Sequence, residues 1–301
     1  ISLMFLAACN NEDEAVSTDP MDYPAEIRGV VKDYAATETT KTVSSIWTEG
    51  DAIGVTTAAG ISKISYIMTD DRNVKYAYNA EKDVFQVVSK EGEDHTIYFK
   101  GPYTMSMTAY APYTGERGTL AGVIQASTTS EKQVGTARAT IDFLYAEGGG
   151  SQTNPRVEFQ FFHKMSQLVL AFKAGGGLEL DDISYTLKNI ILDGSFDTSA
   201  GSVASGKTTG NINMSLAKGK EMNSSVIVFP QKLASTLLLE LAMGGKTYAQ
   251  PIGNGIDLIS GNTYIFDVTI APQSMTVSPA KIEDWIWGEN SDHYVIAGES
   301  E

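Results

Sequence analysis

The sequence predicts an all-β protein made of two stacked β-sandwich domains. Apolar residues recur at every second position in many short segments, whereas no long segment keeps the 3.6-residue apolar repeat of a helix. Turn-forming Gly, Asp, Asn and Ser residues separate these segments at intervals typical of sandwiches. The length of 301 residues, at roughly 150 residues per domain, indicates two domains.

The amino-acid composition excludes several classes of protein. The chain has 22 Lys and Arg against 37 Asp and Glu, a net charge of −15, and therefore lacks the clustered basic face of a nucleic-acid-binding protein. Its hydrophobic fraction of 42% is enough to bury a core in each domain. Cys9 is the only cysteine, which excludes an intrachain disulfide and a multi-cysteine metal site.

Residues 1–9 are interpreted as the remnant of a lipoprotein signal whose upstream part is missing. An apolar run ends in Leu6-Ala7-Ala8-Cys9, which resembles the bacterial lipobox, where the cysteine becomes the lipid-modified first residue. The run is shorter than the ~20 residues that a membrane-spanning helix needs. We therefore expect lipidation at Cys9 and anchoring to the outer membrane. The alternative is a buried structural cysteine.

Residues 10–24 are polar and contain proline, and they are interpreted as a flexible tether. Their first part, Asn10 to Glu14, is similar to the acidic surface-export signal of Bacteroidota lipoproteins. The alternative is a merely solvated segment.

The N-terminal domain is predicted over residues 25–150 and the C-terminal domain over residues 151–301. A Gly/Ser/Asn/Pro cluster at residues 147–155 marks the boundary between them. Alternating apolar residues predict strands; the clearest segments are 25–31, 157–161, 168–172, 212–216 and 264–270. Residues 224–230 and 236–243 are more continuously apolar, which favours central strands covered on both faces.

Residues 201–208 (GSVASGKT) match the phosphate-binding P-loop pattern. A working P-loop opens a helix, but residues 209–216 alternate like a strand. The match is therefore interpreted as a hairpin loop, and no nucleotide cofactor is expected.

No other segment carries a recognisable catalytic or metal-binding motif. His95, His163 and His293 lie far apart in the sequence, and His163 is expected to make a structural hydrogen bond. The acidic pairs at residues 70–71 and 181–182 stand beside turn residues and are interpreted as solvated turns. We expect no metal, no cofactor and no catalytic residue, although a dispersed hydrolase site remains an alternative.

Trp285 and Trp287 would share one face of a strand at the spacing i, i+2. Such a pair forms either a sugar-stacking platform or the apolar edge of the second core.

Six short segments form an ordered series of motifs. The segments are residues 47–54 (WTEGDAIG, for W-x-x-G-D-x-I-G), 109–113 (AYAPY, for A-Y-Y-P-Y), 142–146 (DFLYA, for D-x-L-x-A), 161–168 (FFHKMSQL, for F-x-H-x-x-S-x-L), 261–266 (GNTYIF, for G-x-x-Y-x-F) and 282–285 (IEDW, for I-x-x-W). In this order they resemble the motifs of the fimbrillin family of Bacteroidales, the subunits of type V pili. Alanine at position 111 replaces an aromatic residue of the family pattern.

The resemblance implies two tandem transthyretin-like β-sandwich domains and no enzymatic activity. It also implies that a trypsin-like or arginine-specific protease removes an N-terminal strand and that a strand of a neighbouring subunit fills the groove. The displaced strand would contain Ile27, Val30 and Val31, with either Gly29 or Val31 facing inward beside Ile27. The processing candidates are Arg28, Lys32 and Lys41.

The donor-strand candidates lie at the C-terminal end, where Pro279 is expected to face an unpaired side or mark a bend. These candidates are Met275, Val277, Ile282, Trp285 and Trp287.

These expectations combine into a surface-exposed lipoprotein precursor of a structural or adhesive pilus subunit. Its expected partners are other pilus subunits through strand exchange and the outer membrane through a lipid anchor, with a host protein or glycan as an open further partner. The alternative is a carbohydrate-binding surface lipoprotein of a glycan-uptake system, which requires Trp285 and Trp287 to be exposed on one face.

Overall fold

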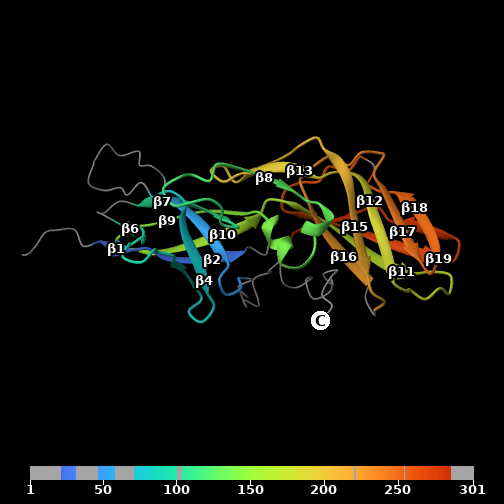
Figure 1. Cartoon of the computed structure of the whole chain (residues 1–301), viewed down its shortest axis with the longest axis horizontal. Coiled ribbons are helices and arrows are strands. Elements are labelled where there is room, and N and C mark those ends of the chain that lie inside the picture. The colour runs from blue at the N-terminus through green and yellow to red at the C-terminus, as the bar shows by residue number, and fades with distance from the viewer. Residues whose placement is uncertain are drawn as a thin grey trace, which may run out of the picture.

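The computed structural model describes residues 22–31, 47–57, 71–99, 104–219, 222–253 and 255–285. Within these ranges the regular structure consists of β-strands and two short 3-10 helices, so the prediction of an all-β protein is confirmed. The strands form an elongated body in which the N-terminal half lies at one end and the C-terminal half at the other (Figure 1).

The strands of the first half form a closed barrel, where the sequence predicted a β-sandwich. Its strands follow each other in the order β10-β2-β5-β4-β3-β7-β9, and the contact between β9 and β10 closes the ring. The alternation of apolar residues could not distinguish the two architectures, because both turn every second side chain inward. The barrel strands are β2 (Glu26–Val31), β3 (Ala52–Thr57), β4 (Val74–Asn79), β5 (Val84–Val87), β7 (Met105–Ala111), β9 (Leu144–Gly150) and β10 (Arg156–His163), and β1 (Tyr23–Pro24) pairs with β6 (Tyr98–Phe99) in a separate two-stranded sheet.

The barrel interior is filled by large apolar side chains from every one of these seven strands. Strand β10 shows the principle most clearly, because Val157, Phe159 and Phe161 are fully buried and the residues between them are exposed. Burial of each such side chain contributes roughly 1.5–3 kcal/mol.

The second half is a β-sandwich of two sheets that share one apolar core. In one sheet the order is β16-β11-β19-β20, with β21 also paired to β19, and in the other it is β15-β12-β17-β18. These strands are β11 (Ser166–Ala174), β12 (Ile183–Ile191), β15 (Thr209–Leu216), β16 (Met222–Val228), β17 (Leu238–Met243), β18 (Lys246–Pro251), β19 (Asn262–Ala271), β20 (Ser274–Val277) and β21 (Lys281–Asp284).

Each of the two strands expected to be central and covered on both faces meets one part of that prediction. Strand β16 is covered on both faces but lies at the edge of its sheet. Strand β17 is central but buries only one face. Its hairpin to β18 turns through Gly244 and Gly245, both at positive φ (56° and 74°), a conformation that glycine adopts without strain.

A third sheet and a third apolar cluster connect the two halves. The sheet has the order β14-β13-β8, and its strand β8 comes from the first half of the sequence. Its strands are β8 (Val123–Ser127), β13 (Asp193–Asp197) and β14 (Ser202–Ser205). The cluster combines residues of both halves, among them Tyr110, Phe143, Phe196, Phe229 and Trp285.

The expected domain boundary between residues 150 and 151 falls in the turn between β9 and β10. Both strands belong to the barrel, and the first strand of the sandwich begins at Ser166. A division of the chain into residues 25–150 and 151–301 therefore stays a prediction, while the hydrogen bonds place β10, which follows residue 150, in the barrel.

In the described residues, the helical segments are too short to cross a membrane. The same part of the chain contains no group of three or more His, Cys, Asp or Glu side chains arranged for a metal ion.

Candidate functional site around strand β2

Strand β2 lies between β10 and β5 in the barrel. It runs parallel to β10 over all six residues, from the pair Glu26 and Arg156 to the pair Val31 and Phe161. Its pairing with β5 is antiparallel and is limited to Ile27 and Phe85. Every other pair of barrel strands is antiparallel. Removal of β2 would therefore leave β10 and β5 without their shared neighbour and open the barrel along one slot.

The inward face of β2 is formed by Ile27, Gly29 and Val31. Ile27 is buried, with 1% of its surface exposed, and Val31 packs against the barrel core. A Cβ atom at Gly29 would lie 2.8 Å from the Phe161 ring and 3.0 Å from the Phe85 ring. Glycine is therefore the residue that lets these two rings lie across the strand, and both predicted alternatives for the second inward residue are correct.

Trp47, which is not part of β2, contacts this strand and both strands beside it. Its indole N–H donates a hydrogen bond of 3.0 Å to the Gly29 carbonyl oxygen. Its ring packs edge-on against Phe85 (centroids 5.1 Å apart) and Phe161 (5.2 Å apart). Such edge-to-face pairs contribute roughly 0.5–1.5 kcal/mol beyond the burial of area. Trp47 therefore links β2 to both strands beside it.

The residues after Trp47 explain the first family-like motif. The backbone N–H and hydroxyl of Thr48 both donate to the Asp51 carboxylate, at 2.7 and 3.0 Å. Gly50 has a φ of 88°, which completes this tight turn. The turn directs the chain into β3, where Ile53 is fully buried.

The processing candidates differ in what the structure says of them. Arg28 lies on the outer side of β2, half-buried, in an ion pair of 2.8 Å with Glu26. Lys32 and Lys41 lie outside the described residues, as does Cys9.

The donor-strand candidates are part of the sandwich in this structure. Strands β20 and β21 pair with opposite ends of β19. Met275 is buried, Val277 is half-buried and Ile282 is exposed. Residues 278–280, including Pro279, separate β20 from β21, in agreement with the expected bend. Trp287 lies outside the described residues.

Trp285 is buried at the junction of the two halves, with 4% of its surface exposed. Its ring stacks on the His163 ring at 4.2 Å with an interplanar angle of 3°. His163 Nδ1 lies 2.7 Å from the Asp142 carboxylate, which confirms the structural hydrogen bond expected for this histidine. A buried Trp285 cannot stack on a sugar at the surface.

The P-loop match does not form a phosphate site. Its first half is strand β14, where a hairpin loop was predicted, and strand β15 follows it as predicted. The Asp193 carboxylate accepts hydrogen bonds from the backbone N–H and hydroxyl of Thr208, at 2.8 and 3.0 Å. The backbone hydrogen bond from Thr208 is the main cause that lowers the pKa of Asp193. A negative charge therefore stands beside the residues that would hold a phosphate.

One residue of the two acidic pairs differs from its prediction, and its neighbour Asp70 lies outside the described residues. Asp71 is buried instead of solvated, because its backbone N–H and carbonyl both bond to Thr57 at the end of β3. Asp182 fits the predicted exposed turn, and its carboxylate accepts the Lys218 backbone N–H at 2.8 Å.

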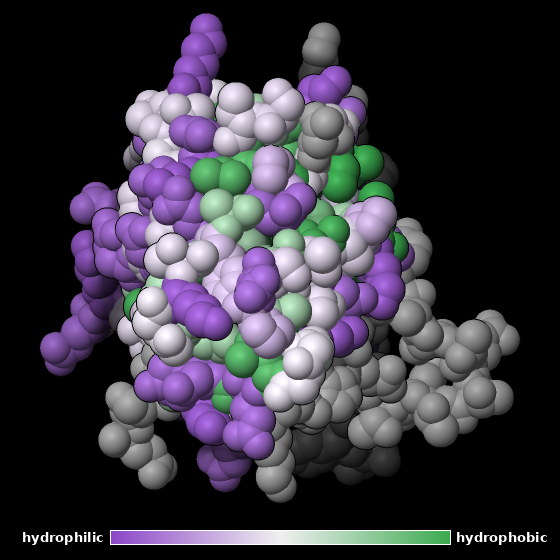
Figure 2. Space-filling model, turned by 90° about the vertical axis from the view of Figure 1, so that its right-hand side faces the viewer, coloured by the Kyte–Doolittle hydropathy of each residue, from purple (hydrophilic) through white to green (hydrophobic). Residues whose placement is uncertain are grey.

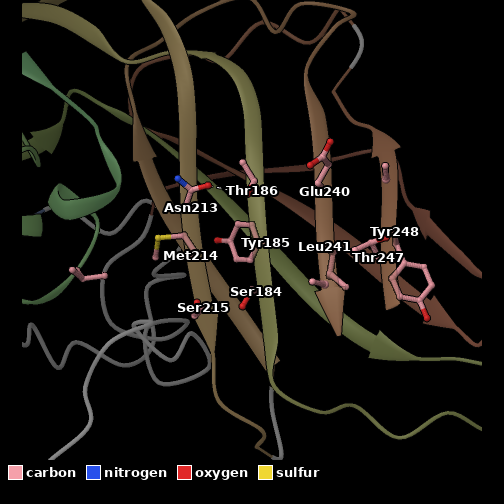
Figure 3. A pocket seen from close by; sticks show the side chains of 13 residues that line it. Ser184, Tyr185, Thr186, Asn213, Met214, Ser215, Glu240, Leu241, Thr247 and Tyr248 are labelled. Carbon is pink, nitrogen blue, oxygen red and sulfur yellow. Dashed lines mark hydrogen bonds between the residues drawn. The ribbon is translucent and has the colours of Figure 1, made fainter. Parts of the chain in front are cut away.

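A broad concavity of about 730 Å³ lies over the second sheet of the sandwich (Figure 3). Polar and apolar residues of neighbouring strands line it, and Thr186 donates to the Asn213 side-chain oxygen at 2.8 Å. Glu240 is paired with Lys188 at 2.6 Å. The arrangement offers hydrogen bonds to a polar surface but brings together no nucleophile and base among the described residues.

The exposed end of the second half presents a mixed surface. Apolar residues there are interrupted by hydrophilic and neutral ones (Figure 2). The described residues that this view shows therefore form no continuous apolar area of the kind that marks a protein interface.

The sequence interpretation missed how Gly29, Phe85 and Trp47 act together on β2. A glycine between alternating apolar residues was the available signal, because glycine inside a strand marks a close approach. The pairing partner β10 gave no signal, because it lies more than a hundred residues away in the chain.

The chain is similar to fimbrial and cell-adhesion proteins of Bacteroides. Residues 36–285 match the family described as Fimbrillin-like. A Bacteroides uniformis protein whose name describes it as a fimbrium subunit, Fim1C, is 27% identical over 265 residues, which cover 83% of this chain and 82% of the relative.

Two solved structures, both described as cell adhesion proteins, resemble this one. The structure from Bacteroides ovatus is 32% identical, with a TM-score of 0.78, and the match covers 89% of this chain and 100% of the relative. The structure from Bacteroides uniformis is 24% identical, with a TM-score of 0.65 and coverage of 87% and 99%, and it supports the fold alone.

Proposed function

Because the chain belongs to the fimbrillin-like family, we propose that it is the precursor of a pilus subunit that assembles by proteolysis-triggered strand exchange. The chain is a fimbrial, cell-adhesion subunit of the Bacteroides type and a structural protein rather than an enzyme. The proposed step is the removal of β2 and its replacement by a strand of a neighbouring subunit.

The observation that carries this proposal is the position of β2 in the barrel. It is an N-terminal strand that separates β10 from β5, and it is the single parallel neighbour of β10 within the described barrel. Its loss would uncover unpaired backbone groups and an apolar slot beneath Ile27 and Val31. An added strand satisfies both, which is the driving force of β-augmentation.

The geometry of the slot restricts the replacement strand. At the position of Gly29 the rings of Phe85 and Phe161 leave no space for a Cβ atom unless they move. The incoming strand therefore carries glycine at this position, with apolar residues two places before and after it, or displaces the two rings. Each buried aliphatic side chain would contribute roughly 1.5–3 kcal/mol.

The cleavage position follows from the same geometry. A protease binds an extended, unpaired segment, and Arg28 lies in the middle of a paired strand. Cleavage after Lys32 or Lys41 would instead release the whole of β2. We therefore favour these two lysines over Arg28 as processing residues.

The donor segment is proposed to be the C-terminal stretch that contains Met275, Val277, Ile282, Trp285 and Trp287. Residues 275–287 contain no glycine, so this donor would have to displace the Phe85 and Phe161 rings. Strand β21 is exposed along its full length and is held through its backbone pairing with β19. Donation would therefore lose little packing at β21, but it would uncover Met275 and Trp285.

The remaining parts of the proposal concern architecture and location. The two halves would be tandem transthyretin-like domains, and lipid attached to Cys9 would hold the precursor to the outer membrane before assembly. Partners would be other pilus subunits and, on the host side, a protein or glycan. The rival sugar-binding function has lost support, because Trp285 is buried.

The test is controlled cleavage of the purified precursor. Mild trypsin treatment should convert monomer into heat-resistant oligomers, seen on a gel without boiling, and mass spectrometry should map the cut. Deletion of residues 275–301 should prevent the conversion without unfolding the barrel, which tests the donor separately. Cleavage at a mapped site with the protein still monomeric at high concentration would contradict the proposal.

A further inference from the structure

Strand β16 is an edge strand, and side chains bind three of its outer backbone groups, the N–H and C=O of Ile227 and the C=O of Ser225. On one side it pairs with β11 over seven residues, from Met222 to Val228. On the other side, within the described part of the chain, no strand is hydrogen-bonded to it. An edge of this kind is normally available to another strand.

Gln133 occupies the position that a neighbouring strand would take. Its side-chain oxygen accepts the Ile227 backbone N–H at 2.8 Å, and its side-chain nitrogen donates to the Ile227 carbonyl oxygen at 2.9 Å. The same nitrogen also donates to the Thr128 carbonyl oxygen at 2.9 Å. Gln133 is completely buried. One carboxamide therefore reproduces the donor and acceptor of a strand partner.

Arg138 binds the next outward-facing residue of the edge. One guanidinium nitrogen donates to the Ser225 carbonyl oxygen and the other to the Ser225 hydroxyl, both at 2.9 Å. Gln133 and Arg138 thus satisfy alternate residues of β16, which is the spacing at which a strand exposes its backbone groups on one edge.

The segment that carries these two residues closes one side of the sandwich. It contains the 3-10 helices η1 (Ser130–Lys132) and η2 (Gly135–Thr140). The Ser130 hydroxyl accepts the Asn213 backbone N–H of β15, the edge strand of the facing sheet, at 2.9 Å. The segment, which precedes the sandwich strands in the sequence, lies beside β15 and β16 (Figure 1).

The sequence of β16 makes this protection necessary. Residues 224–229 read SSVIVF, without a charged residue or a proline. All six are buried, and the four apolar ones belong to the core clusters. Such segments pair readily when their edge is free. The edge strand β18, by contrast, carries Lys246 at its start and Pro251 at its end, and these residues discourage pairing.

We propose that Gln133 and Arg138 guard the β16 edge, and that without them β16 pairs with the β16 strand of a second copy of this chain. Antiparallel pairing of the same strand from two copies is self-complementary and forms a closed dimer. This protection of β16 exists in the uncut precursor. Strand β16 belongs to the sandwich and β2 to the barrel, so the proposal is independent of the proposed strand exchange.

The test compares the full-length, uncut chain with the variant Gln133→Ala/Arg138→Ala. Sedimentation velocity over a concentration series should show a dimer in the variant, with an apparent dissociation constant lower than that of the wild type by roughly tenfold or more. Lys132→Ala is the matched control, because it removes a charge from the same segment without a contact to β16, and it should stay like the wild type.

Hydrogen exchange identifies the surface that pairs. The Ile227 amide should exchange faster in the dilute double variant than in the wild type and become protected again as the dimer forms. A folded variant that stays monomeric, or a dimer that leaves Ile227 unprotected, would overturn the proposal. If the double variant does not fold, Arg138→Ala is the second variant. It removes the bonds to Ser225 and to the Gln133 carbonyl oxygen but leaves the Gln133 side chain in place. It must dimerise at higher concentration, and its failure to do so would overturn the proposal equally.

Discussion

Gly29→Ala should weaken the attachment of β2 while leaving every hydrogen bond of the strand possible. The new methyl carbon would lie 2.8 Å from the Phe161 ring, closer than ordinary contact allows. Phe161 is completely buried and is held by Trp47, so its ring has little room to move. Overpacking of this kind costs about 1–3 kcal/mol, while alanine recovers about 0.4–1 kcal/mol by restricting the unfolded chain. We expect a net loss of about 0.5–2 kcal/mol in the free energy of unfolding.

Two measurements check this value. Urea denaturation gives the free energy of unfolding, and the initial rate of trypsin cleavage after Arg28, mapped by mass spectrometry, reports the opening of β2, because Arg28 lies inside the paired strand. If cleavage requires that opening, the same free energy corresponds to an increase in rate of about 2- to 30-fold.

Val30→Ala is the matched control, because Val30 lies on the outer face of the same strand and is half-exposed. It should change the free energy of unfolding by less than about 1 kcal/mol. Equal effects of Gly29→Ala and Val30→Ala, or no change in the cleavage rate with either, would refute the reasoning. The rings of Phe85 and Phe161 would then not restrict which side chain fits at position 29.

Three further predictions concern other parts of the chain. Burial raises the pKa of Tyr110 to about 12, so its contribution to stability should be complete below about pH 10 and lost as the pH rises towards 12; urea midpoints measured over this range should fall less steeply in Tyr110→Phe, and equal slopes would contradict the prediction. Lys207→Ala should leave the urea midpoint unchanged, and isothermal titration with ATP should give no heat of binding for either protein, whereas saturable binding lost in the variant would restore the P-loop interpretation. Cys9→Ser should abolish incorporation of an alkynyl fatty acid in cells, and equal labelling of both proteins would contradict the lipobox interpretation.

The strand pattern was predictable from the sequence, because alternation is a local property. Val157, Phe159 and Phe161 alternate with polar residues, and all three are buried as expected. The closure of the barrel was not predictable, because it depends on the pairing of Ile27 with Val157, two residues far apart in the sequence. Alternation specifies which face of a strand is buried but not which strand lies beside it.

The prediction of a central position for residues 224–230 shows the same limit. Continuous apolar sequence indicates that both faces are covered, and for β16 this is correct. It contains no information on the two edges, where Gln133 and Arg138 take the place of a strand. These two residues lie in a polar segment about ninety positions earlier, and nothing in that segment indicates a strand-like role.

The candidate site was predictable in part. The alternation of residues 25–31 identified the strand, and the family-like motif marked Trp47. The close contact of Gly29 with Phe85 and Phe161 depends on the folded positions of three strands. The prediction for Asp71 was wrong for a related reason. Its acidic neighbour and the turn residues that follow it suggested an exposed side chain, but backbone hydrogen bonds to Thr57 hold the residue in a buried position.

The most direct test of the account is a cryo-electron microscopy structure of the polymer formed after cleavage. The account predicts that residues 26–31 of each subunit are absent from the slot between β10 and β5. A strand from the next subunit should lie there instead, with a glycine opposite Phe161 or with the Phe85 and Phe161 rings displaced. Subunits that retain β2 in the slot and contact each other through other surfaces would contradict strand exchange.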